Sequence, residues 1–231
     1  MRALILLFFM ICSNSALALN QSDSSQVLAY WENLFDDRNV LSLEREAVQL
    51  RQLSGMAYRD EDRLTVTAAN GKAVSFVDRP DCDGPEAAEC IRHRLAMVLS
   101  SVNAVLIFRQ HYENYSFALI DLKEAATFDF KDVPIFSPDN RHIAEISNDL
   151  STDVFIKIYG FDQNVLTEEY SGHPYFDDMG SSEYKHPIWL NSRELSVQSE
   201  KLDRQNNTKS AISFTIKLDS NRSWILNSLR Q

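Results

Sequence analysis

Apolar and polar positions alternate along most of the chain after residue 60. The runs 64–68 and 73–77 place an apolar residue at every second position, which is the pattern of β-strands that bury one face. Asn70-Gly71 stands between these runs. This dipeptide predicts a β-hairpin with a type I′ turn, because both central residues of that turn need positive φ and Asn and Gly tolerate it.

Short apolar runs continue to the C-terminus and are separated by turns that contain Asn, Asp, Ser or Pro. Their spacing, mostly 8 to 12 residues, predicts antiparallel meanders, and no long helical pattern intervenes to connect parallel strands. The predicted strands are Leu95–Leu99, Ala104–Gln110, Tyr115–Leu122, Thr127–Phe130, Ile143–Ile146, Val154–Tyr159, Val165–Tyr170, Ile188–Leu190, Glu194–Gln198, Ala211–Leu218 and Trp224–Leu226.

The segment before these strands has a helical period. Between Val27 and Leu53 apolar residues recur at steps of three and four, with Ser25 and Ser42 as candidate N-caps. We therefore predict a mainly β fold of antiparallel meanders in blade-like sheets, with short N-terminal helices. The predicted organisation is a signal peptide at 1–18, a polar leader and helical segment at 19–60, and a β-rich domain at 61–231.

The first 18 residues have the pattern of a secretory signal peptide. Arg2 precedes an apolar run from Ala3 to Ile11, and the small-residue triplet Ala16-Leu17-Ala18 follows. The alternative is an uncleaved anchor, but a run near 10 residues is short against the roughly 20 that a spanning helix requires. We expect cleavage after Ala18, a periplasmic or secreted location, and no stable membrane span afterwards.

Export changes the interpretation of the cysteines. Removal of the signal leaves Cys82 and Cys90, an even count in an oxidising compartment, and this predicts a disulfide bond between them. The alternative, a redox-active or metal-binding pair, favours CxxC-like proximity, whereas these residues are eight positions apart.

Composition excludes several classes of ligand. The 231 residues carry 23 Lys+Arg against 33 Asp+Glu, a formal net charge of −10, and basic residues do not cluster, so nucleic acid is not expected as a partner. The six glycines form neither a GxxxxGK[ST] nor a GxGxxG loop. No cofactor is therefore predicted.

Residues 133–144, Val-Pro-Ile-Phe-Ser-Pro-Asp-Asn-Arg-His-Ile-Ala, resemble the TolB-like (PD40 or WD40-like) β-propeller repeat. Asn140 stands where that repeat has Gly, and Asn tolerates the left-handed backbone that the turn needs. Residues 187–195 resemble a second, degenerate copy, offset by 53 residues. The resemblance, which extends to short exported bacterial proteins with an SPDG-like repeat, implies an incomplete or compact propeller-like arrangement and an envelope location. It transfers no catalytic residue.

The densest group of chemically active side chains lies between the two copies. Two imidazoles and three carboxylates occur within 14 residues and are suited to a divalent cation or to protein recognition. The alternative to a metal site is an ordinary solvated acidic loop, because the spacing matches no defined ligand motif. We predict a binding loop rather than a metal or catalytic site, formed by His173, Asp177, Asp178, Glu183 and His186. His142 is expected to be structural, and His111 to lie at a hairpin tip.

Two functions fit this sequence. The favoured one is a non-enzymatic envelope protein that binds another protein, for example as an inhibitor or immunity partner of a cationic enzyme or toxin, because an acidic exported domain attracts such a partner electrostatically. The alternative is a hydrolase or metal-dependent enzyme that uses the 173–186 loop. No HExxH or GxSxG motif supports the alternative.

Overall fold

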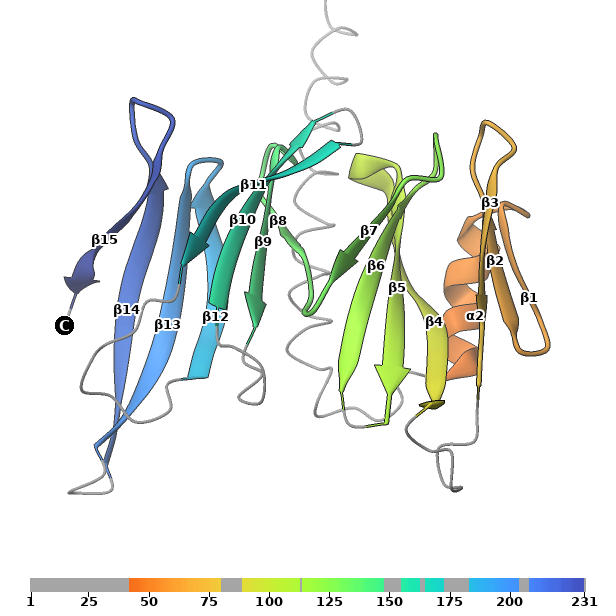
Figure 1. Cartoon of the computed structure of the whole chain (residues 1–231), viewed down its shortest axis with the longest axis horizontal. Coiled ribbons are helices and arrows are strands. Elements are labelled where there is room, and N and C mark those ends of the chain that lie inside the picture. The colour runs from red at the N-terminus through yellow and green to blue at the C-terminus, as the bar shows by residue number, and fades with distance from the viewer. Residues whose placement is uncertain are drawn as a thin grey trace, which may run out of the picture.

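The computed structural model describes residues 42–79, 89–112, 114–147, 155–162, 165–172, 183–203 and 208–230. This part of the chain forms four antiparallel sheets, one short α-helix and one 3-10 turn, so the predicted mainly β fold class is confirmed. In Figure 1 the sheets follow one another across the molecule, from orange to blue. No helix in these residues is long and apolar enough to cross a membrane.

Each sheet is a meander in which the spatial order of the strands equals their order in the chain. Sheet A contains β1 (Ala57–Asp60), β2 (Arg63–Thr67) and β3 (Ala73–Val77), and sheet B contains β4 (Ile91–Leu99), β5 (Ala104–His111), β6 (Tyr115–Asp121) and β7 (Thr127–Phe130). Sheet C contains β8 (Ile135–Phe136), β9 (His142–Ser147), β10 (Phe155–Asp162) and β11 (Val165–Gly172), and sheet D contains β12 (Glu183–Asn191), β13 (Glu194–Asp203), β14 (Thr208–Leu218) and β15 (Trp224–Arg230). The helices are α2 (Leu43–Gln52) and η3 (Ser100–Val102).

The sheets are held together by side chains that point alternately to the two faces of each strand. In β5, Leu106 and Phe108 pack in one cluster with Phe136 and Ile143 of sheet C, whereas Val105 and Ile107 pack in another with sheet A. Sheet B is therefore buried on both faces, and this explains why β5 reads as a nearly continuous apolar run.

A third cluster joins sheets C and D. Ala144, Ile146, Ile156 and Ile158 of sheet C pack there with five side chains of sheet D, which are Leu195, Val197, Phe214, Ile216 and Trp224. Beyond sheet D no described element follows, and large apolar side chains remain exposed at Ile188 (48%), Leu190 (56%) and Ile225 (43%). Within the described residues the blade-like sheets thus form an open stack rather than a closed ring.

The Asn70-Gly71 hairpin is confirmed, but its predicted turn type is wrong. Only Gly71 has positive φ (82°), and the chain turns over a longer loop in which Gly71 N donates to Ala68 O and Ala68 N donates to Lys72 O. A type I turn followed by a left-handed glycine has this pattern. Strand β1 was not predicted, because its four residues Ala57–Asp60 carry no clear alternation.

The turn expected in the repeat is confirmed. Asn140 has φ of +58°, as predicted for the position that glycine occupies in the family. Both repeat copies lie at equivalent places: Phe136 and Trp189 belong to the first strand of sheets C and D, and Ile143 and Leu195 to the second.

Helix α2 begins at the predicted N-cap, since the Ser42 hydroxyl accepts a hydrogen bond from Arg45 N at 3.3 Å. The earlier candidate helix at 27–35 and its cap Ser25 lie outside the described residues. Ten residues are too few for a stable helix in isolation. Packing therefore has to stabilise α2. Leu50 of the helix and its C-cap Leu53 join the apolar cluster between sheets A and B.

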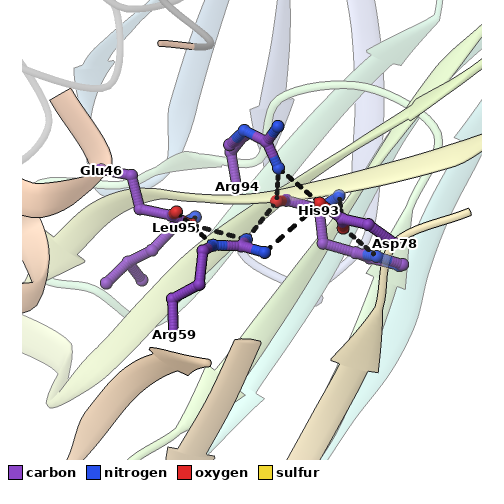
Figure 2. A network of polar contacts seen from close by, with 6 residues as sticks. All are labelled: Glu46, Arg59, Asp78, His93, Arg94 and Leu95. Atoms are coloured by element: carbon purple, nitrogen blue, oxygen red, sulfur yellow. Dashed lines mark hydrogen bonds and ion pairs between the residues drawn. The ribbon is translucent and has the colours of Figure 1, made fainter. Parts of the chain in front are cut away.

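A buried polar network fixes α2 to both sheets (Figure 2). Glu46 is 2% exposed, and its carboxylate accepts hydrogen bonds from the Arg59 guanidinium of β1 at 2.5 and 3.0 Å. The same carboxylate accepts the backbone N–H of Leu95 in β4 at 2.8 Å. Asp78 directly follows β3, and its carboxylate accepts a hydrogen bond from the Arg94 guanidinium at 2.7 Å. It also accepts the backbone N–H of His93 at 2.7 Å and lies 3.2 Å from Nδ1 of the His93 ring. The helix, sheet A and sheet B are therefore joined through two carboxylates.

The pKa of Asp78 reflects this surrounding. Burial alone would raise it, but hydrogen bonds from His93 and Arg94 and the charge of Arg59 outweigh burial, and the pKa falls to about 2. A carboxyl with a lowered folded-state pKa contributes stability that is complete above its unfolded pKa and is lost as pH falls towards its folded pKa.

We predict that the free energy of unfolding declines by about 2 kcal/mol between pH 4 and pH 2 through Asp78. Urea denaturation at successive pH values measures this decline. The Asp78→Asn variant should be less stable at pH 7 and should lack this part of the pH dependence, whereas the exposed control Asp60→Asn should keep it. Identical pH profiles for wild type and Asp78→Asn would contradict the assignment.

Candidate functional site

One end of the stack is built from turns that share a side-chain brace. In each, an Asp or Asn side chain accepts the backbone N–H two residues further on, which is the geometry of an Asx turn. The pairs are Asn70 with Lys72 at 2.9 Å, Asp121 with Lys123 at 3.1 Å, Asp139 with Arg141 at 3.2 Å, Asn191 with Arg193 at 2.9 Å and Asp219 with Asn221 at 2.8 Å. In four of these turns the residue that donates the N–H is itself basic. In the fifth turn the donor is Asn221, and the basic residue Arg222 follows it.

All four sheets are antiparallel meanders, so every second turn of a sheet lies at the same end of its strands. The five turns lie at one end of the molecule, at the top in Figure 1. Backbone hydrogen bonds connect several of them. Ala69 N in the β2–β3 turn donates to Leu122 O after β6 at 2.8 Å, Phe161 N donates to Arg141 O at 2.7 Å, and Leu218 N donates to Arg193 O at 2.9 Å. We call this end of the molecule the turn end.

A cavity of about 1090 Å³ opens at the turn end between sheets C and D. Three arginines line it: Arg141 from the β8–β9 turn, Arg193 from the β12–β13 turn and Arg222 from the β14–β15 turn. These residues are up to 81 positions apart in the chain. The stacking of two sheets brings them together.

The three guanidinium groups differ in their partners. Arg193 Nη2 donates to the carbonyl oxygens of Asp219 at 2.6 Å and Leu218 at 3.3 Å, so this side chain braces the neighbouring turn. Arg141 and Arg222 are exposed, and their guanidinium groups make no hydrogen bond or ion pair with the described residues. Two cationic groups at the cavity are thus available to a ligand.

Three carboxylates also line the cavity, and two of them are already engaged. Asp139 accepts the Ser137 hydroxyl at 2.7 Å within its own turn. Glu169 accepts Trp224 Nε1 at 2.9 Å and lies 3.5 Å from His142 Nε2. Asp162 is exposed at the end of β10. The cavity therefore offers charges of both signs.

His142 forms part of the wall. Its side chain is 14% exposed, and its ring lies 5.2 Å from Trp224 and 6.2 Å from Trp189. Nδ1 is buried and has no hydrogen-bond partner among the described residues. The expectation of a structural histidine accounts for the packing of the ring, but not for its position at the cavity.

Gly160 makes room for Glu169. A Cβ at position 160 would overlap the carboxylate of Glu169, which crosses the glycine to reach Trp224. The missing side chain of Gly160 therefore permits the Glu169–Trp224 hydrogen bond, in which Glu169 is a lining residue of the cavity.

The structure places the predicted site residues only in part. His173, Asp177 and Asp178 lie outside the described residues, while Glu183 and His186 belong to strand β12 rather than to the connecting loop. Cys90 is buried (3% exposed) and Cys82 lies outside the described residues, so the Cys82–Cys90 bond stays a prediction.

His111 is paired within its own hairpin. It was expected at the hairpin tip and is instead the last residue of β5, and its Nε2 lies 3.3 Å from the Ser116 hydroxyl of β6. Burial, together with the charges of His93 and Arg109, lowers the pKa of His111 and favours the neutral ring. Among the described residues no carboxylate hydrogen-bonds this imidazole. The described residues also contain no group of three His, Cys, Asp or Glu suited to a metal ion.

Sequence reasoning missed the cavity residues Arg141, Arg193, Arg222 and Glu169. The signal that could have found the arginines is the repeated Asx turn followed by a basic residue. Comparison with known proteins finds no matching family model and no matching curated protein. The resemblance of residues 133–144 to a TolB-like repeat therefore rests on those residues alone.

We predict that Gly160→Ala displaces the Glu169 carboxylate and lowers the free energy of unfolding by about 0.5–1 kcal/mol, because the new methyl group breaks the bond to Trp224. Urea denaturation followed by circular dichroism measures the loss, and tryptophan fluorescence reports the changed surroundings of Trp224. In a Glu169→Ala background the same change should be nearly neutral. An equal loss in both backgrounds would show that Glu169 is not the group that Gly160 accommodates.

Proposed function

We propose that this protein is a non-enzymatic, exported envelope protein that binds another protein at its turn end. The observation that carries the proposal is the pair Arg141 and Arg222, two guanidinium groups without partners among the described residues, at the cavity between sheets C and D. Exposed charged groups on braced turns of a β scaffold are characteristic of recognition surfaces.

The way the turns are built favours binding. Asp219 holds its turn by accepting from Asn221 N and Ser223 N, both at 2.8 Å, so Arg222 projects from a preorganised loop. A loop whose backbone is already ordered loses little backbone entropy on binding. The catalytic alternative through the 173–186 loop draws no support from the described residues.

We further propose that the partner is a cationic enzyme or toxin of the envelope. The formal net charge of −10 creates a long-range attraction for such a partner, and this attraction weakens as salt is added. The acidic loop with His173, Asp177 and Asp178 fits the same role. We interpret the four sheets as blades of an incomplete TolB-like propeller that carries these loops.

Location and covalent state belong to the same proposal. A signal peptide cleaved after Ala18 would deliver the chain to an oxidising compartment, and a Cys82–Cys90 bond would close the segment between β3 and β4. In the chain-entropy model a loop of this size contributes about 2–3 kcal/mol.

We predict that protein purified from the envelope fraction begins at Leu19 and contains no free thiol. Intact-mass spectrometry before and after reduction and alkylation measures both features, because the mass fixes the first residue and the mass gain counts the cysteines. Labelling of two cysteines without reduction would exclude the disulfide, and an intact Met1 would exclude cleavage.

We predict that the mature chain, residues 19–231, captures a basic protein from envelope extract. Because Arg141 and Arg222 would bind an acidic group on that partner, the double variant Arg141→Gln/Arg222→Gln should capture at least tenfold less of it, although this variant is more negative by two charges. Quantitative mass spectrometry of the bound fraction at low and moderate salt measures the difference. The matched control Arg63→Gln changes an exposed arginine on strand β2 of sheet A and should behave as wild type. Equal capture by wild type and the double variant would remove the cavity from the binding surface.

A further inference from the structure

We propose that the cavity between sheets C and D recognises a carboxylate of a peptide segment, with Arg141 and Arg222 as the two arms of a clamp. This inference rests on the proposed binding function and names the chemical group that the site would take. It draws on the two arginines, the other polar groups of the cavity, and its size.

The clamp arises from two turns on different sheets. Arg141 follows the Asx turn of Asp139 in sheet C, and Arg222 follows that of Asp219 in sheet D. Both line the same cavity without a partner among the described residues. A guanidinium presents a planar fork of N–H donors that matches the two oxygens of a carboxylate, so the two arginines are suited to grip one such group.

The remaining polar groups favour a carboxylate within a peptide over a phosphate. Asp162 and Glu169 face the same cavity, and their negative charges would repel a dianion more strongly than a monoanion. The same carboxylates, with the hydroxyls of Thr167 and Ser220, can accept the N–H groups that a peptide backbone donates. A ligand with one negative group and several N–H hydrogen-bond donors is thus complementary to the lining of the cavity.

The size of the cavity fits a segment of a polypeptide. Its volume of about 1090 Å³ reaches the upper end of the range for small-molecule pockets, roughly 300–1,000 Å³. Apolar contacts come from Phe161, Val165 and Leu218. A carboxylate bound by the arginines would place neighbouring residues of its chain along this apolar part of the wall.

The test is a titration of the mature chain with four probes, followed by the fluorescence of Trp189 and Trp224, which pack against His142 in the cavity wall. The probes are acetyl-Ala-Leu-Glu-amide, acetyl-Ala-Leu-Ala with a free C-terminus, the neutral acetyl-Ala-Leu-Gln-amide, and inorganic phosphate. We expect at least one carboxylate peptide to bind tenfold or more tightly than the neutral peptide. The first two probes distinguish a side-chain carboxylate from a terminal one.

The variants test the clamp itself. Arg141→Gln and Arg222→Gln should each weaken the carboxylate peptide about tenfold or more, as expected for loss of a charge-assisted hydrogen bond. Lysine at either position should restore affinity only in part, because an ammonium keeps the charge but not the fork. The control Arg63→Gln should not change binding. Circular dichroism verifies that each variant is folded.

The outcomes separate this inference from the proposed function. Equal binding of the neutral and acidic peptides, tighter binding of phosphate than of both carboxylate peptides, or no peptide binding at millimolar concentration would overturn the carboxylate clamp. If the protein partner is still captured through Arg141 and Arg222 in that case, the binding function stands and only the ligand chemistry is wrong. If the acidic peptides bind but no protein is captured, the clamp stands and protein capture fails.

Discussion

The fold depends first on the pairing of a buried charge. Glu46 lies on a ten-residue helix and is 2% exposed, and an ionised carboxylate at such depth is strongly unfavourable unless positive charge and N–H donors surround it. Arg59 of β1 and the backbone of Leu95 in β4 provide them, so the helix, sheet A and sheet B satisfy the carboxylate only when all three are in place. The apolar cluster beneath gives most of the attraction, because burial of apolar area is non-directional. The carboxylate selects the one arrangement in which its partners meet.

Polar bonds of the same kind recur at the next two interfaces between sheets. Between B and C, Glu145 is 3% exposed and accepts the Tyr159 hydroxyl and the backbone N–H groups of Lys131 and Asp132. Between C and D, Trp189 donates to Ile135 O at 3.0 Å and Trp224 donates to Glu169. Apolar faces alone would allow one sheet to slide over another, whereas these directional bonds fix the position of each sheet relative to the next. This relative position determines which hairpin turns become neighbours, and it places arginines from three turns around one cavity.

Alternation of apolar and polar residues was sufficient to predict most strands, because side chains of a meander point alternately to two faces. Thr127–Phe130 was predicted to the residue, and Asn140 was expected to adopt positive φ. The Asn70-Gly71 turn type was wrong, because a longer loop lets Asn70 brace Lys72 N through its side chain.

The cavity was not predictable in the same way. Arg141, Arg193 and Arg222 are separated by whole strands, and only the packing of sheet C on sheet D brings them together. They share a local pattern, an Asx turn with a basic residue, and this pattern is visible in the sequence. It does not indicate how far apart the three turns lie in the folded protein.

The charge distribution acts on two length scales. The net charge of −10 belongs to the whole chain and attracts cations from beyond the Debye length only weakly at physiological salt, so its effect lies mainly in the rate of encounter. The cavity acts within a few ångströms, where Arg141 and Arg222 have no partner in the part of the chain that the structure describes, although acidic residues outnumber basic ones. Exposed arginines in an acidic protein readily find a carboxylate neighbour unless their turns hold them apart. The carboxylates of Asp139 and Asp219 are near in sequence, but both are engaged by backbone N–H groups of their own turns. The Asx turns therefore direct one oxygen of each carboxylate to its own backbone, and they fix the two loops from which Arg141 and Arg222 extend to the cavity.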